Sequence, residues 1–213
     1  MFQLFGVLLN LIYSVNNMNV TRGTGFLEKF LSNQRAKIVD KNIADDLRSG
    51  KILDIGCGNF PYFLSRIKFV KKIGVDKEFG DYKVDDIELI KFNFESGNLL
   101  PFEDKMFEVI TILAVLEHMK SELACDVLKE ARRVLKNNGE LFITVPRDRG
   151  DKLLRLLSMF GFVSKVEIDE HVQLYNKSNL TNQLLSAGFK KGDIEIRSFE
   201  FGFNIFVKVR GNV

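Results

Sequence analysis

The sequence predicts an α/β fold in which a mostly parallel β-sheet is covered by helices on both faces and ends in an antiparallel hairpin. Short apolar runs alternate with helical segments along most of the chain, as they do in sheets whose strands are joined by crossing helices. One of these runs ends in an acid followed by two closely spaced glycines. The end of the chain alternates as two strands about a glycine.

Sequence features predict where each helix and strand begins and ends. A leader helix is expected over about residues 26–47, because "RSG" closes the pattern with a basic residue and a glycine. The clearest crossing helix covers 121–135, with Ser121 as its N-cap and "NNG" as its stop, and a shorter helix covers Ser178 to Ala187. The final hairpin is expected over 193–210, with its turn near Gly202. The parallel strands are expected at 51–55, 71–76, 89–94, 107–114 and 139–145.

Composition narrows the class of protein. The 213 residues suit one globular domain with a full core, with 46% apolar and 28% charged residues. A net charge of +3 without a polybasic run gives no strong signal for nucleic acid as a partner. Cys57 and Cys125 form no CxxC pair, which indicates neither a disulfide framework nor a zinc site and favours a reducing cytoplasm.

The first fifteen residues, "MFQLFGVLLNLIYSV", are almost wholly apolar. A membrane-spanning helix needs about 20 apolar residues, and a secretory signal needs a basic start and a cleavage site that this stretch lacks. Two interpretations are left: a helix that packs on the domain or covers its pocket, which we favour, and a peripheral membrane contact through residues 1–15. Membrane association and a homodimer are both left open.

The segment "KILDIGCGNF", which starts at Lys51, leads from a buried strand into a glycine loop. In open α/β folds such a loop lies at the carboxyl edge of the sheet, where ligands bind, and glycine lets a ligand approach the main chain. A triphosphate loop needs GxxxxGK, and a dinucleotide loop needs a third glycine where Pro61 stands. The charge of Asp54 opposes a pyrophosphate and suits an ammonium group.

The same segment resembles the first motif of class I S-adenosylmethionine-dependent methyltransferases, an acid followed by GxGxG. Later segments are similar to further motifs of this family, in the family's order, over about residues 51–189: "IGVD", "NFESGNLLPFEDKMFEVITILAVLEHM", "EARRVLKNNGELFITVP" and "HVQLYNKSNLTNQLLSAGF". The likeness is to the small-molecule, type 11-like branch. It implies a Rossmann-like sheet of seven strands, S-adenosyl-L-methionine as cofactor and no metal.

The chain departs from the family pattern in three places. Phe60 replaces the third glycine of the first motif, and Asn93 stands where an aspartate often holds the adenine amino group. An amide oxygen can accept the same hydrogen bond with less assistance from charge. The stretch between Asp76 and Ile87 is short and polar, so the usual second crossing helix is expected to be reduced or absent.

The resemblance implies cofactor contacts at the first motif. Asp54 would attract the α-amino group of the cofactor, through water or main chain, although a strand-end helix cap is the alternative. The main chain of Gly56, Cys57 and Gly58 would lie against the cofactor, which is compatible with ordinary tight-turn chemistry. The Cys57 thiol itself is a small filler without a chemical role.

Further contacts are implied downstream. Asp76, followed by Lys77, would accept both ribose hydroxyls, and a solvated acid is the alternative. Asn93 is assigned to the adenine. Phe94 and Leu113 would sandwich its ring, although such residues are often core. His118, with Glu117 before it, would lie near the cofactor or anchor the start of a helix.

His171 is the candidate catalytic residue, because an imidazole can accept a proton from a hydroxyl as the methyl group transfers. A loop histidine with a satisfied hydrogen bond is the alternative. The preceding insert at 147–171 carries a broad apolar surface and several basic residues, which suggests a lid over an amphipathic acceptor or, alternatively, a helix facing the core.

We therefore expect an N-terminal helical cap at 1–48 and a methyltransferase domain at 49–213 that includes the lid-like insert. The expected reaction is methyl transfer to a small-molecule acceptor, with oxygen of a sugar, a lipid-linked compound or another metabolite as the favoured site. The alternative is a non-catalytic S-adenosylmethionine-binding regulatory domain, for which Phe60 and Asn93 would be the evidence.

Overall fold

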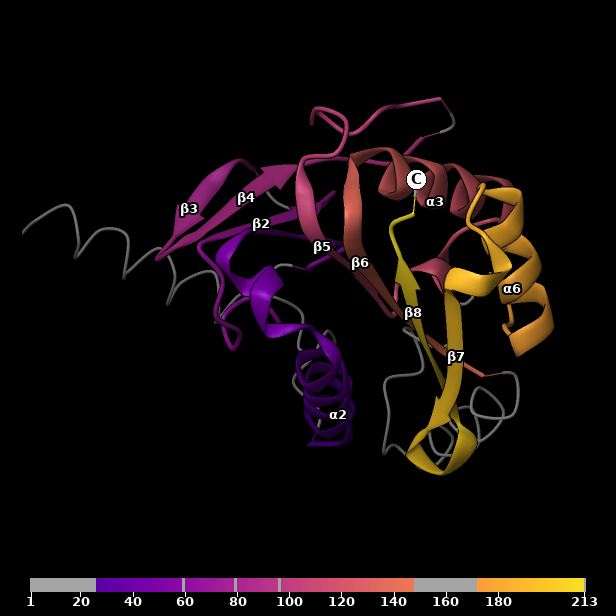
Figure 1. Cartoon of the computed structure of the whole chain (residues 1–213). Coiled ribbons are helices and arrows are strands. Elements are labelled where there is room, and N and C mark those ends of the chain that lie inside the picture. The colour runs from indigo at the N-terminus through magenta and orange to yellow at the C-terminus, as the bar shows by residue number, and fades with distance from the viewer. Residues whose placement is uncertain (1–25, 59, 79, 96, 148–171, 213) are drawn as a thin grey trace, which may run out of the picture.

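Eight strands form one mixed sheet in the computed structural model, which describes residues 26–58, 60–78, 80–95, 97–147 and 172–212 (Figure 1). The strand order is β3-β4-β2-β1-β5-β6-β8-β7. The strands are β1 Lys51–Ile55, β2 Lys71–Asp76, β3 Tyr82–Val84, β4 Ile87–Lys91, β5 Phe107–Leu113, β6 Leu135–Pro146, β7 Ile194–Phe199 and β8 Asn204–Arg210. The mostly parallel α/β sheet with a C-terminal antiparallel hairpin is confirmed.

Helices cover both faces of this sheet. The α-helices are α2 Phe26–Asn42, α3 Ser121–Val134 and α6 Lys177–Ser186, and the short 3-10 helices are η1 Asp45–Ser49, η2 Leu116–His118, η3 Lys191–Asp193 and η4 Glu200–Gly202. Figure 1 shows α3 and α6 together on one side, whereas α2 lies on the other. The predicted helices at 121–135 and 178–187 are therefore confirmed to within a residue at either end.

The core consists of two clusters, one on each face of the sheet. Leu53 of β1 and Ile110 of β5 pack with α3 and α6, whereas their neighbours Ile52 and Val109 pack with α2. Successive side chains of a strand point to opposite faces, and a parallel strand that is covered on both sides is apolar throughout. This is why β1 and β5 read as continuous apolar runs in the sequence.

The sheet has eight strands and not the seven expected, because β3 forms within the polar stretch that follows β2. It pairs antiparallel with β4, with Tyr82 opposite Leu89 and Val84 opposite Ile87, and its three side chains are exposed. A short antiparallel return thus replaces the second crossing helix, whose reduction was predicted. The strand expected at 89–94 lies at 87–91. Its pairing with β2 begins with Ile87 opposite Lys72 and ends with Lys91 opposite Asp76.

The crossing from β1 to β2 runs through turns after Pro61. One helical hydrogen bond forms there, from the Ser65 amide to the Pro61 carbonyl (2.9 Å). The buried Lys72 ammonium then donates to the carbonyls of Leu64 (3.0 Å) and Ile67 (3.4 Å). These carbonyls thus hold the crossing segment against the next strand.

The leader helix ends at Asn42, earlier than the predicted residue 47, and η1 follows it. The Asn42 side-chain amide donates to the Ile38 carbonyl (2.7 Å), and Lys208 of β8 donates to the Asn42 carbonyl (2.9 Å). Side-chain donors thus occupy carbonyls around the helix end. The last of these contacts comes from the far end of the chain, so local sequence could not predict it.

The hairpin of β7 and β8 lies on the β6 side of the sheet. β8 pairs antiparallel with both β6 and β7, and Gly202 adopts a φ of 86° in the turn between them. Because β6 and β8 run in opposite directions, Pro146 at the end of β6 lies opposite Asn204 at the start of β8. The turn of the hairpin is therefore at the carboxyl edge of the parallel strands.

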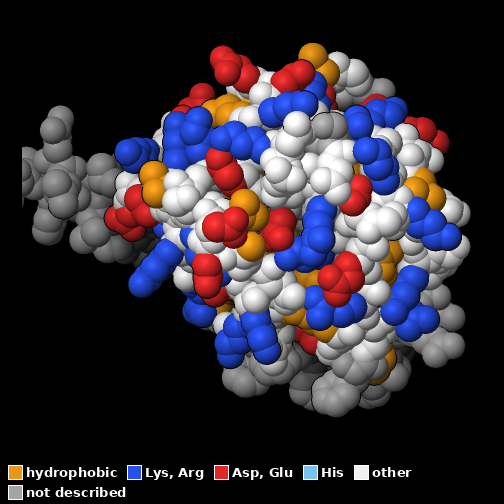
Figure 2. All heavy atoms as spheres, viewed as in Figure 1, with side chains coloured by type: hydrophobic (Ala, Val, Ile, Leu, Met, Phe, Trp, Pro, Cys, Tyr) orange, Lys and Arg blue, Asp and Glu red, His pale blue; other side chains and the backbone are white. Residues whose placement is uncertain are grey.

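Basic and acidic side chains are interspersed on the face shown in Figure 2, with small scattered apolar groups between them. This face carries no continuous basic surface over the described residues, unlike a typical nucleic-acid interface. Within the same described ranges, no helix has the length and apolar character needed to cross a membrane. The predicted apolar segment at 1–15 and nearly all of the insert at 147–171 lie outside the described residues.

Candidate functional site

The glycine loop forms a tight turn at the carboxyl end of β1. Gly56 and Gly58 have φ angles of 75° and 71°, in the region that favours glycine. A Cβ on Gly56 would lie 2.4 Å from a Val115 methyl carbon, whereas a Cβ on Gly58 would meet no atom of the described residues within 4 Å. Packing therefore requires glycine at the first position, and the second leaves open space beside the main chain.

The main chain of this loop is tied to β2. The amides of Gly56 and Cys57 donate to the Val75 carbonyl at 2.8 and 3.3 Å. The Gly58 amide donates to Oδ2 of Asp76 (2.9 Å), and the Glu78 amide donates to Oδ1 of the same carboxylate (3.0 Å). Asp76 thus anchors the loop, and each of its oxygens retains a further lone pair for a ligand hydroxyl.

Asp54 is buried at the start of the loop, where the Thr111 hydroxyl donates to its Oδ1 (2.6 Å). Burial raises the pKa of this carboxyl to about 7; the Thr111 hydrogen bond lowers it, and the charge of Asp76 raises it again. A positive group placed beside Asp54 would favour the ionised form. The site therefore suits an ammonium group.

Cys57 and Lys77, which lie near these acids in the sequence, contact other protein groups. The Cys57 side chain packs over Gly74, where an added Cβ would lie 2.6 Å from its sulfur. Burial, together with the charges of Asp54 and Asp76, raises the pKa of the Cys57 thiol, so the thiolate is disfavoured. Lys77 is exposed, and its ammonium lies 3.8 Å from Glu78.

The segment after β4 carries the predicted adenine contacts. The Phe92 amide donates to the Asp76 carbonyl (2.8 Å), which holds the segment against β2, and the rings of Phe92 and Phe94 meet edge to face at 4.8 Å. Asn93 is exposed and donates to Oε1 of Glu95 (3.1 Å). Phe94 packs with the cluster on the α3 face, whereas Leu113 packs with the α2-face cluster, so the two have different neighbours.

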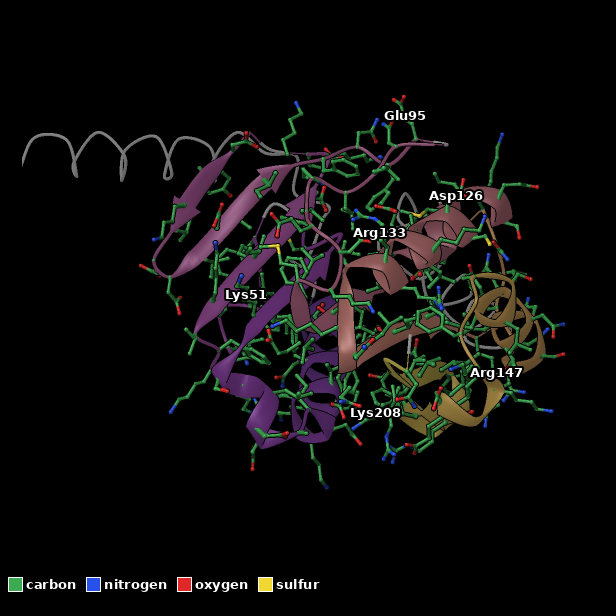
Figure 3. All side chains as sticks on the ribbon, turned by 45° about the horizontal axis from the view of Figure 1, so that its top comes forward. Lys51, Glu95, Asp126, Arg133, Arg147 and Lys208 are labelled. Carbon is green, nitrogen blue, oxygen red and sulfur yellow. The ribbon has the colours of Figure 1, made fainter. Side chains whose placement is uncertain are left out.

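The loop that carries "LPF" is fixed by Arg133 of α3, whose position beside this loop Figure 3 shows. The guanidinium donates to the carbonyls of Phe102 (2.9 Å) and Leu100 (3.1 Å) and pairs with Asp104 (2.7 Å). The Leu100 amide donates in turn to Glu130 (2.7 Å), which is itself paired with Arg133. Hydrogen bonds from Arg133 and Glu130 of α3 therefore hold this loop in place next to the segment with the predicted adenine contacts.

The turn after β5 forms the other half of this edge. Ala114 has a φ of 57°, unusual for a residue with a side chain and common at functional turns, and η2 follows directly. His118 is exposed, whereas Glu117 is 2% exposed, and Oε2 of Glu117 has no hydrogen-bond partner among the described residues. Burial raises the pKa of the Glu117 carboxyl to about 7, against smaller effects of its own main-chain amide and of Arg35.

Sequence reasoning treated Glu117 only as the partner of His118, and nothing local indicates that it is buried. The main chain supplies part of the reason, because the amides of Val172 (2.9 Å) and Gln173 (3.1 Å) donate to the Glu117 carbonyl. Tyr175, two residues after Gln173, is fully buried. His171 itself lies outside the described residues, so its predicted role stays a prediction.

A separate hollow of about 500 Å³ lies between α3 and α6, with Ser121, Asp126 and Gln183 among its lining residues (Figure 3 labels Asp126). Its lining contains none of the predicted site residues. Among the described residues, no group of three or more His, Cys, Asp or Glu side chains is arranged to hold a metal ion.

Comparison with known proteins gives a family for the chain. A family model described as a methyltransferase domain matches residues 27–192. A demethylmenaquinone methyltransferase of Staphylococcus saprophyticus is 28% identical over 204 residues, which cover 83% of this chain and 86% of the relative. The 27-O-demethylrifamycin SV methyltransferase of Amycolatopsis mediterranei is 30% identical over 144 residues, with 59% of this chain and about half (52%) of the relative covered.

Solved structures agree on the fold. The structure of an S-adenosylmethionine-dependent methyltransferase from Thermotoga maritima superposes with a TM-score of 0.62 at 18% identity, covering 86% of this chain and 90% of that one. At this identity the likeness concerns the fold alone.

Proposed function

The chain belongs to the methyltransferase-domain family, and on that premise we propose that it transfers the methyl group of S-adenosylmethionine to an oxygen atom of a small molecule. The class is that of the class I S-adenosylmethionine-dependent methyltransferases, and the enzyme uses this cofactor. The oxygen acceptor and the individual contacts below are our proposals.

The observation that carries the cofactor assignment is the main chain beside Gly58. Within the described residues it faces open space, its amide is bound to Asp76, and Asp54 of β1 lies four residues before it in the sequence. We assign Asp54 to the α-amino group and Asp76 to the ribose hydroxyls, with the main chain of 56–58 along the middle. Asn93 and Phe94 are assigned to the adenine, and Lys77, Leu113 and His118 to the borders of the same site.

When bound, the cofactor supplies a methyl group that is already activated by a sulfonium. The protein therefore acts mainly by positioning, which can contribute on the order of 7 to 11 kcal/mol when the nucleophile is held in line. In this proposal, Asp54 and Asp76 hold the two ends of the cofactor. The tight turn at Gly56, which packs against Val115, holds the glycine loop in place. A proton acceptor is needed only when the acceptor atom carries a proton.

Oxygen is favoured as the methyl acceptor by two observations. The relative from Amycolatopsis is named for a substrate that lacks a methyl group on an oxygen. In this chain, a buried carboxyl with an unpartnered oxygen follows β5, where a hydroxyl could donate to it. His171 is the second candidate proton acceptor, and its replacement by alanine measures whether it is needed.

Calorimetry with S-adenosylmethionine and S-adenosylhomocysteine tests binding, and release of labelled methyl product with hydroxyl compounds tests turnover. Micromolar binding of both ligands with methylation of a hydroxyl compound is expected. Absence of binding would contradict the cofactor site, and methylation of carbon or nitrogen alone would contradict the oxygen acceptor.

A further inference from the structure

Buried oxygens without hydrogen-bond partners gather at the β5 and β6 end of the carboxyl edge. Oε2 of Glu117 and Oγ1 of Thr144 are buried and have no partner among the described residues, and neither does Oε1 of the half-buried Glu200. Such groups are rare in folded proteins because each loses its hydrogen bonds to water. Three of them at one edge indicate a place where a ligand supplies the donors.

The strand register brings these residues to the same edge and two of them to the same face. Thr144 lies opposite Leu113 of β5 and Phe206 of β8, and Leu113 and Phe206 both belong to the α2-face cluster. Asn204, two residues before Phe206, has the same orientation and donates to Oε2 of Glu200. Thr144 and Asn204 therefore face the α2 side of the sheet, Glu200 is bound to Asn204, and Glu117 follows β5 at the same edge.

Arg35 of α2 adds a positive charge to this group. Its charge lowers the pKa of both Glu117 and Glu200, although burial raises both overall. Arg35 thus acts on both carboxyls, one at the end of β5 and the other in the turn of the hairpin. We call the group of Arg35, Glu117, Thr144 and Glu200 the acceptor chamber.

We propose that the acceptor chamber receives a hydroxyl group of the methyl acceptor and that Glu117 takes the proton of that hydroxyl during transfer. This inference rests on the proposed function and adds its substrate class and a catalytic residue. Thr144 and Glu200 would accept hydrogen bonds from further hydroxyl groups of the same molecule. The expected acceptor is therefore a neutral compound with at least two neighbouring hydroxyl groups.

The acceptor oxygen forms a bond to the methyl carbon while the bond between that carbon and sulfur breaks, and its electron pair stays on sulfur. The hydroxyl proton passes to Oε2 of Glu117, and later to solvent. No oxidant, reductant or metal is needed.

Charge favours a hydroxyl compound over an amine. An ammonium group would meet the positive charge of Arg35, whereas a hydroxyl oxygen becomes more negative as its proton moves to Glu117, and Arg35 stabilises that charge. Arg35 of α2 acts on Glu117, and Glu117 in turn raises the pKa of Tyr175, which belongs to the cluster on the opposite face of the sheet. A carboxyl that titrates near neutral pH is suited to accept and release a proton.

The test compares wild type with Glu117→Gln, an isosteric variant that cannot take the proton, and with Glu122→Gln as a matched control on the exposed start of α3. Labelled methyl transfer is measured with catechol, 1,4-dihydroxynaphthalene and methyl glucoside as hydroxyl probes and benzylamine as an amine probe. S-adenosylhomocysteine affinity is measured by calorimetry on the same samples.

We expect transfer to at least one hydroxyl probe, a loss of kcat of about 100-fold or more in Glu117→Gln, and wild-type rates in Glu122→Gln. S-adenosylhomocysteine affinity should stay within twofold, and the acidic limb of the pH profile should disappear in Glu117→Gln. The proposal is overturned if Glu117→Gln keeps the wild-type rate, if only benzylamine is methylated, or if the protein binds S-adenosylhomocysteine but methylates none of the hydroxyl probes. Failure to bind S-adenosylhomocysteine at all would instead contradict the cofactor site.

Discussion

The two halves of the carboxyl edge differ in how their polar groups are satisfied. At β1 and β2, Thr111 donates to Asp54, and both oxygens of Asp76 accept main-chain amides. At β5 and β6, Glu117 and Thr144 keep buried oxygens without partners among the described residues. A satisfied half keeps its shape before a ligand arrives, whereas the other half needs a ligand to complete its hydrogen bonds.

This difference separates two tasks within one edge. The cofactor side is preorganised, and substitutions there should disturb both folding and cofactor affinity. The acceptor chamber holds a destabilising carboxyl, and its removal should increase stability while catalysis is lost, as is common at functional sites.

Gly56→Ala should have the largest effect on the satisfied half. The left-handed backbone costs about 1–2 kcal/mol for a residue with a Cβ, and the contact with Val115 at 2.4 Å adds about 1–3 kcal/mol of overpacking. Urea unfolding should show this loss, together with S-adenosylhomocysteine binding weakened at least 100-fold. Gly192→Ala is the control, because a Cβ there meets nothing within 4 Å; equal stability of the two variants would contradict the packing argument.

Glu117→Gln should stabilise the protein above neutral pH. The pKa of Glu117 is raised from 4.5 to about 7, so protonation favours the folded state, and wild-type stability falls as pH rises from about 4.5 through about 7. Glutamine does not ionise, so the variant should gain up to about 3 kcal/mol over wild type at pH 8.5 and little at pH 4. The raised pKa of Asp54 is common to both proteins and cancels in this difference.

Thermal unfolding of both proteins across this pH range measures the effect. A Glu117→Gln variant that is less stable than wild type at pH 8.5 would mean that the carboxyl has a structural partner. The two halves of the carboxyl edge would then not differ in how their polar groups are satisfied.

Gly58→Ala should lower stability less than Gly56→Ala does and should also weaken cofactor binding. Its Cβ has free space, so the φ of 71° costs only about 1–2 kcal/mol. The added methyl group would occupy the open side of the main chain, where we place the cofactor, and S-adenosylhomocysteine affinity should fall about tenfold. Unchanged affinity in calorimetry would mean that the ligand does not lie against this residue.

Asn93→Ala should have the smallest effect. One neutral hydrogen bond to the adenine contributes about 1 kcal/mol, so S-adenosylhomocysteine should bind about fivefold more weakly and the free energy of unfolding should hardly change. The side chain is exposed and contacts Glu95, which makes Glu95→Ala the control for a purely local loss. Affinity equal to wild type would remove Asn93 from the site.

Much of this molecule follows from local sequence, and the exceptions have identifiable physical causes. Buried strands such as β1 and β5 have continuous apolar runs, and Gly56 and Gly58 mark a turn that only glycine tolerates. The carbonyl at the early end of α2 accepts from Lys208, and the turns after Pro61 are bound by Lys72, both of which lie on strands distant in sequence. The burial of Glu117 could not be predicted because distant segments cover it.

In the proposed site, Asp54 and Asp76 bind opposite ends of the cofactor. Calorimetry of Asp54→Asn and Asp76→Asn with S-adenosylhomocysteine and with 5′-methylthioadenosine, which lacks the amino-acid end, distinguishes the two contacts. Asp76→Asn should weaken both ligands by roughly 10- to 100-fold, whereas Asp54→Asn should weaken only S-adenosylhomocysteine. Equal affinities in Asp76→Asn and wild type, or equal losses for both ligands in Asp54→Asn, would contradict the claim.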